Sequence, residues 1–62
     1  MAWLAVDKDG REFIYKEKPE RMRNSFFYSS DEYVRITGGT IEIIIGRKLT
    51  WDDEPVELKE SN

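Results

Sequence analysis

The chain has 62 residues, a formal net charge of −3, and neither cysteine nor histidine. This composition excludes a disulfide framework and the usual Cys/His zinc cage, and it removes the two side chains that most often carry nucleophilic or acid–base chemistry near neutral pH. A chain of this length buries only about 60% of the surface that its unfolded form exposes. We therefore expect its aromatic residues and isoleucines to supply a thin core, and we expect no enzyme, no metal and no cofactor.

The organisation along the chain is simple. No apolar run approaches the roughly 18 residues needed to span a bilayer, and the first residues lack the basic and apolar regions of a signal peptide. We expect a cytoplasmic protein without a membrane partner. Residues 1–58 are predicted to form a single small domain, and residues 59–62 a frayed tail.

The first predicted element is a β-hairpin. Two apolar runs, 3–6 and 12–15, flank an Asp-Gly pair, which is a strong hairpin signal because glycine adopts positive φ at little cost. The spacing places Trp3 opposite Tyr15 on one face of the hairpin and turns Leu4 to the other face. Because both faces are partly apolar, we expect something to cover each of them.

Further strands are predicted along the chain. Pro19 should end the second strand, and the alternation of residues 21–28 predicts a continuous third strand. Residues 33–36 and 56–58 read as two more strands. This order indicates an antiparallel meander.

The segment 40–46 is ambiguous. Its β-branched residues favour a strand, whereas Thr40 as an N-cap and Gly46 just after the last helical residue favour a short helix. We favour the helix, with its isoleucines at 41, 44 and 45 turned to the sheet. The predicted fold class is therefore α+β: a small antiparallel β-meander of 4–5 strands with one short helix near residues 40–46.

Several stretches of the chain carry a resemblance: the opening Trp3-Leu-Ala-Val-Asp-Lys-Asp-Gly10, the segment Lys18-Pro-Glu-Arg21, and, near the end, Gly39-Thr-Ile-Glu42 and Ile45-Gly-Arg-Lys-Leu-Thr-Trp-Asp-Asp-Glu-Pro-Val-Glu-Leu58. In these stretches the chain resembles a set of short uncharacterised proteins encoded in bacterial genomes and prophages. The resemblance implies a small accessory protein and supplies no catalytic or binding residues.

An acidic turn supplies the first group of candidate interaction residues. Trp51 is followed by three adjacent carboxylates, Asp52, Asp53 and Glu54, just before Pro55. Such residues usually form a solvated turn, and they can also act as an acidic recognition patch or hold a hard cation weakly. Tryptophan beside charged residues is typical of an interface rim, although a small core also needs large aromatic residues.

A basic and aromatic stretch supplies the second group. Positive side chains beside aromatic rings hold single-stranded nucleic acid without sequence preference, as in small OB-type barrels. Glu17 and Glu20 dilute the stretch, the whole chain is acidic, and at least two of the three aromatic residues 26–28 should be packed inside. The candidate nucleic-acid residues are Lys16, Lys18, Arg21, Arg23 and Phe27.

The sequence predicts a non-enzymatic protein–protein interaction module of bacterial or phage origin. Its partner is another protein or a second copy of the chain, since an exposed sheet edge is expected at this size and edge strands pair readily. The alternative is a nucleic-acid-binding module, a small OB- or SH3-like β domain that uses segment 16–28. A third hypothesis is that the acidic C-terminal face mimics a nucleic-acid backbone.

Overall fold

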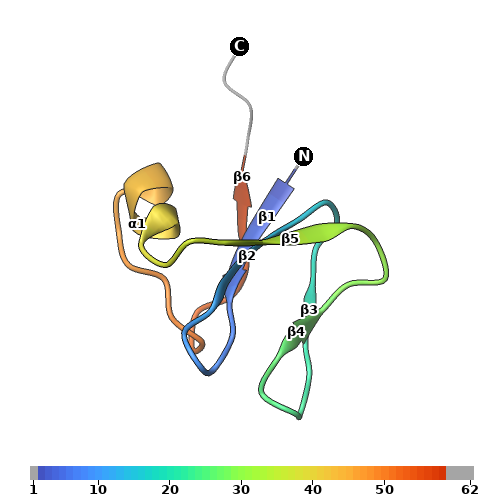
Figure 1. The fold of residues 1–62 in the computed structure, drawn as a ribbon. Coiled ribbons are helices and arrows are strands. Elements are labelled where there is room, and N and C mark those ends of the chain that lie inside the picture. The colour runs from blue at the N-terminus through green and yellow to red at the C-terminus, as the bar shows by residue number, and fades with distance from the viewer. Residues whose placement is uncertain (1, 59–62) are drawn as a thin grey trace.

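The computed structural model describes residues 2–58, which form a small α+β fold (Figure 1). The predicted tail at 59–62 lies outside the described residues. No helix within residues 2–58 has the length and apolar character needed to cross a membrane. The elements, in chain order, are β1 (Ala2–Val6), β2 (Glu12–Tyr15), β3 (Glu20–Arg21), β4 (Phe27–Tyr28), β5 (Tyr33–Ile36), α1 (Thr40–Ile45) and β6 (Val56–Leu58).

The predicted first hairpin is confirmed, including its register. β1 and β2 pair antiparallel with Trp3 opposite Tyr15, and the Asp7 N–H donates to the Arg11 carbonyl oxygen at 3.0 Å. Gly10 has a φ of 90°, the left-handed conformation that the turn requires and that glycine adopts most readily.

β1 and β2 are the interior strands of a four-stranded antiparallel sheet with the order β5-β2-β1-β6. The predicted strands at 33–36 and 56–58 are confirmed as β5 and β6. In β1, the consecutive residues Leu4, Ala5 and Val6 are all buried, as expected for a strand that is covered on both faces. The expectation that each face is covered is therefore confirmed.

One side of the sheet, which we call the helix face, carries α1. Leu4 and Val6 form its buried core together with Ile41 of α1 and Leu49 of the segment that follows α1. The half-buried residues packed against this core are Ile14, Ile36, Ile45, Val56 and Leu58.

The other side of the sheet, which we call the aromatic face, is covered by the short β3–β4 hairpin and by Trp51. Its buried cluster consists of Ala5, Tyr15 and Phe27. Trp3 and Phe13 pack against this cluster, as does Trp51. Both tryptophans are half-buried, so each contributes to the core with part of its ring surface.

The predicted continuous strand over residues 21–28 is wrong. The chain instead reverses between β3 and β4, which form a separate two-stranded sheet with Arg21 opposite Phe27. The Met22 N–H closes this turn by donating to the Phe26 carbonyl oxygen at 2.8 Å, and Ser25 adopts a positive φ of 75°. Asn24 and Ser25 are turn-forming residues, and their preference overrides the apolar alternation of the segment.

The ambiguous segment is a helix, α1, as predicted. Gly46 lies just beyond its end with a φ of 78°, and its N–H donates to the Glu42 carbonyl oxygen at 2.9 Å, as expected for a left-handed helix terminus. The predicted N-cap was wrong: Gly39 occupies that position. The Thr40 hydroxyl instead donates to the Thr37 carbonyl oxygen at 2.6 Å.

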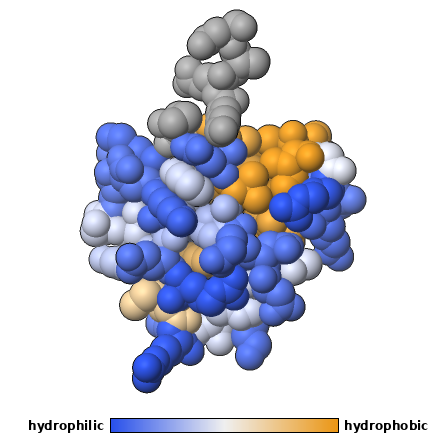
Figure 2. All heavy atoms as spheres, turned by 180° about the vertical axis from the view of Figure 1, so that it is seen from behind, coloured by the Kyte–Doolittle hydropathy of each residue, from blue (hydrophilic) through white to orange (hydrophobic). Residues whose placement is uncertain are grey.

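The prediction that Ile44 faces the sheet is also wrong. Only Ile41 and Ile45, which lie four residues apart, pack on the core, because a six-residue helix presents one narrow stripe to the sheet. Ile44 is 44% exposed and Ile43 is 85% exposed. Figure 2 shows hydrophobic surface gathered on the side of the molecule that carries α1.

A carboxylate from the sheet binds the start of α1. The two carboxylate oxygens of Glu12 in β2 accept from the N–H groups of Gly39, at 2.8 Å, and Ile41, at 2.9 Å. These donors lack partners within the helix, and a negative charge near them is favourable. Glu12 therefore caps the start of α1, the role that was predicted for the Thr40 side chain.

We predict that Glu12→Ala lowers the free energy of unfolding by about 1–2 kcal/mol, the usual cost of losing a helix cap. Glu12→Gln should lower the free energy of unfolding by less, because the amide oxygen of the glutamine can still accept one of the two hydrogen bonds. Urea unfolding followed by tryptophan fluorescence measures both values, with Thr40→Ala as the matched control. A larger loss for Thr40→Ala than for Glu12→Ala would contradict this assignment.

Candidate functional site

The structure brings the two predicted groups of site residues together at Arg21. The Arg21 guanidinium lies 4.5 Å from the ring centroid of Trp51 and 5.1 Å from that of Phe27. It donates to the carbonyl oxygens of Trp51 and, at 3.0 Å, of Asp53, and it lies 3.4 Å from a carboxylate oxygen of Glu54. Arg21 therefore links the β3–β4 hairpin to the acidic turn. Because its guanidinium N–H groups already donate within the protein, fewer of them are free to bind a ligand.

The other three basic candidates for nucleic-acid binding lie in different places from Arg21. Lys18 lies with its Nζ 5.6 Å from the Trp3 ring centroid. Lys16 follows β2 and Arg23 lies in the β3–β4 turn, and both are exposed. Two of the four predicted nucleic-acid cations thus contact aromatic rings of the protein itself.

The acidic turn is held by its own hydrogen bonds. A carboxylate oxygen of Asp53 accepts from the N–H of Thr50 at 2.9 Å and from its hydroxyl at 3.2 Å. The backbone bond from Thr50 holds the pKa of Asp53 below its ordinary value, helped by Arg47 at 3.9 Å. No group of three or more candidate metal ligands is found within residues 2–58.

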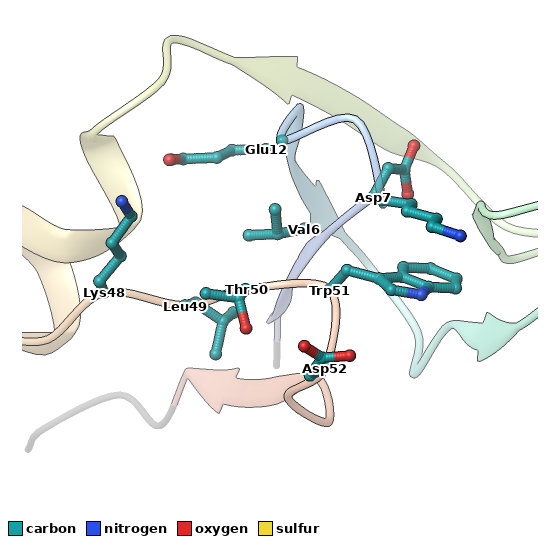
Figure 3. Close-up of a pocket in the computed structure, with 10 residues that line it drawn as sticks. Val6, Asp7, Glu12, Lys48, Leu49, Thr50, Trp51 and Asp52 are labelled. Carbon is teal, nitrogen blue, oxygen red and sulfur yellow. The ribbon is translucent and has the colours of Figure 1, made fainter.

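Figure 3 shows a hollow of about 390 Å³ between the β1–β2 turn and the segment after α1. Three carboxylates come from separate parts of its lining: Glu12 extends towards α1, Asp7 lies at the β1–β2 turn, and Asp52 lies across the hollow from both. Paired carboxylates perform acid–base chemistry only when they share an environment that separates their pKa values. This hollow has no such pair.

A second depression, of about 210 Å³, lies on the aromatic face, and we call it the aromatic groove. It combines rings from the four-stranded sheet with rings from the β3–β4 hairpin. Its remaining lining comes from Asp7, Arg11 and Ser29. The aromatic residues that line the groove are Phe13, Tyr15, Phe26, Phe27, Tyr28 and Tyr33.

The groove has a buried floor and exposed walls. Tyr15 and Phe27 are buried, whereas Phe26, Tyr28 and Tyr33 are 42%, 57% and 56% exposed. The expectation that two of the three aromatic residues at 26–28 are packed inside was therefore wrong. The β3–β4 turn directs only Phe27 to the sheet, and its two neighbours in sequence remain available to a ligand.

The rings on the sheet support one another. Tyr33 of β5 lies 5.6 Å from the ring centroid of Tyr15 and 6.0 Å from that of Phe13, the latter at an edge-to-face angle of 68°. Such aromatic contacts stabilise beyond the area they bury. The exposed Tyr33 ring is therefore held in place before any ligand arrives.

Asp7 positions the hairpin wall of the groove. Its carboxylate is buried and accepts from the Phe27 N–H at 3.0 Å, while the Lys8 N–H donates to the Ser25 carbonyl oxygen at 3.2 Å. Burial raises the pKa of Asp7; the Phe27 bond lowers it by a smaller amount, Asp9 raises it and Arg11 lowers it.

Tyr15 is neutral at physiological pH. Burial, with smaller contributions from the charge of Asp7 and from Tyr33, raises the pKa of its hydroxyl to about 12. This part of the floor of the groove therefore carries no charge.

Sequence reasoning missed the groove as a site. The alternation of side chains in a strand could have found part of it, because it puts Phe13 and Tyr15 on one face of the predicted strand 12–15 and Tyr33 and Arg35 on one face of the predicted strand 33–36. The wall formed by Phe26 and Tyr28 had no local signal, because it depends on the position of the β3–β4 hairpin over the sheet.

We predict that Asp7→Ala lowers the free energy of unfolding by about 1–3 kcal/mol, because the buried Phe27 N–H loses its acceptor. Asp7→Asn retains an acceptor and should be at least as stable as the wild type at neutral pH. Since folding raises the pKa of Asp7, the wild type loses stability as the pH rises through the folded-state value, and Asp7→Asn lacks this loss. Urea unfolding of all three proteins over a pH series measures these free energies of unfolding. An equal loss of stability in Asp7→Ala and Asp7→Asn would contradict the assignment.

The fold and the groove were also compared with known proteins. No protein-family model, curated protein or solved structure matches this chain. The resemblance to short bacterial and prophage proteins stays a prediction.

Proposed function

We propose that this protein is a non-enzymatic interaction module that binds an extended, proline-containing peptide of a partner protein in the aromatic groove. The observation that carries the proposal is the arrangement of three exposed rings, Phe26, Tyr28 and Tyr33, around a buried aromatic floor. Peptides in the polyproline II conformation dock into aromatic-lined grooves, because their preformed shape lowers the entropic cost of binding.

The charges around the groove favour a peptide over nucleic acid. Arg11 is the sole cationic residue of its described lining, Asp7 lies in the same lining, and Arg11 also pairs with Asp9 at 3.4 Å. Single-stranded nucleic acid needs cations that follow its backbone beside the stacking rings. Lys18 and Arg21 contact other rings of the protein, so the alternative of nucleic-acid binding through segment 16–28 has less support.

A non-enzymatic role agrees with the chemistry of the described residues. The carboxylates around the hollow in Figure 3 come from separate parts of its lining, and the raised pKa of Tyr15 leaves its hydroxyl protonated, so that it cannot act as a base near neutral pH. Trp51, Asp53 and Glu54 of the acidic turn support the fold through Arg21. The cytoplasmic location and the bacterial or phage origin stay predictions from the sequence.

The proposal is tested by NMR titration of the labelled protein with a short proline-rich peptide, a glycine–serine peptide of equal length and single-stranded oligothymidine. The proline-rich peptide should shift the resonances of the groove residues. Phe26→Ala should weaken its binding about tenfold, which corresponds to about 1.4 kcal/mol.

Ile43→Ala is the matched control, because it truncates an exposed apolar side chain on α1 outside the groove, and it should leave the affinity unchanged. Equal loss of affinity in both variants, or no saturable shift with the proline-rich peptide, would contradict the proposal. Tighter binding of oligothymidine than of the peptide would support the nucleic-acid alternative instead.

A further inference from the structure

The backbone of the edge strand β5 offers two residues for further pairing. The Lys16 N–H donates to the Glu32 carbonyl oxygen at 3.0 Å, and Tyr15 lies opposite Tyr33. Because hydrogen-bonded and non-hydrogen-bonded pairs alternate in an antiparallel ladder, Val34 and Ile36 direct their N–H and C=O groups to β2. Tyr33 and Arg35 therefore direct theirs away from the sheet, where no other described strand lies.

We propose that β5 pairs antiparallel with β5 of a second copy of the chain, around a twofold axis at Val34. In this register Tyr33 of each copy faces Arg35 of the other, so the outward N–H and C=O groups of both residues are all used. Val34, which is 64% exposed, meets its own counterpart on the helix face. The two four-stranded sheets then form one continuous sheet.

The charges of β5 fit this partner. β5 follows the acidic pair Asp31 and Glu32 and carries Arg35 near its other end. Antiparallel pairing therefore brings the acidic start of one strand to the basic end of the other. Arg35 of the second copy also lies over the ring of Tyr33, an arrangement that favours a cation–π contact.

The two neighbouring registers are less favourable. A shift that centres the axis on Arg35 places two arginines directly opposite each other, which is destabilising. A shift that centres it on Tyr33 needs the backbone of Asp31, whose N–H already donates to the Ser29 hydroxyl at 3.2 Å. The pairing around Val34 uses only residues of β5.

Pairing through β5 would extend the aromatic groove. Tyr33 lines the groove, and Arg35 of the second copy would stand beside that ring on the same face of the joined sheet. Each groove would then contain a cation from the other copy. The inference depends on the free edge of β5 and stands independently of the proposed peptide ligand.

Sedimentation equilibrium over a concentration series provides the first test. The wild type should shift from a mass of 7.4 kDa towards twice that value. Val34→Lys and Val34→Glu should each remain monomeric, because each places like charges face to face at the twofold axis, and their mixture should form a heterodimer. Val34→Thr is the uncharged, β-branched control and should still dimerise.

Amide hydrogen exchange provides the second test, because it reports on the register. The N–H groups of Tyr33 and Arg35 should gain protection as the concentration rises, whereas those of Val34 and Ile36 should not change. A wild type that stays at 7.4 kDa, or a Val34→Lys homodimer, would overturn the proposal. Because Phe26→Ala leaves β5 intact, loss of peptide binding in that variant with an unchanged dimer separates the two proposals.

Discussion

The hydrogen bond between the buried carboxylate of Asp7 and the N–H of Phe27 connects the two sheets of this protein. The β3–β4 hairpin has strands of two residues each, and a hairpin of that size has little stability of its own in water. Its position over the aromatic face therefore depends on contacts with the larger sheet. Asp7 supplies one such contact from the end of β1, and the aromatic groove exists only while the hairpin stays there.

Arg21 supplies a second attachment from another part of the chain. It packs on Phe27 and Trp51 and donates to carbonyl oxygens in the turn that precedes β6. Phe27 is thus held through its backbone by Asp7 and beside its ring by Arg21. In a chain that has no cysteine or histidine and whose core is small, these two attachments add stability that other small domains take from disulfides or a zinc site. Of the predicted site residues, Arg21, Trp51, Asp53 and Glu54 take part in the second attachment.

Local signals were sufficient to predict the four strands of the main sheet and the pairing of the first two, but not the order of the strands in the sheet. The Asp-Gly turn determined the register of β1 and β2, and Gly46 correctly indicated the end of α1. The errors arose where a distant residue decides the outcome. The start of α1 is bound by Glu12, 27 residues before Gly39, and the hairpin wall is positioned by Asp7, 20 residues before Phe27. The exposure of Phe26 and Tyr28, on which the candidate site depends, follows from that second contact and leaves no local pattern.

Native-state amide hydrogen exchange at Phe27 tests the central claim most directly, because it reports on the N–H that Asp7 binds. If Asp7 fixes the hairpin on the sheet, this N–H should exchange nearly as slowly as the amides of the interior strand β1, since opening the contact requires much of the fold to open. Asp7→Ala should remove the protection of the Phe27 N–H, whereas the amides of β1 should stay protected from exchange. An N–H of Phe27 that exchanges at the rate of an unfolded chain in the wild type would contradict the account.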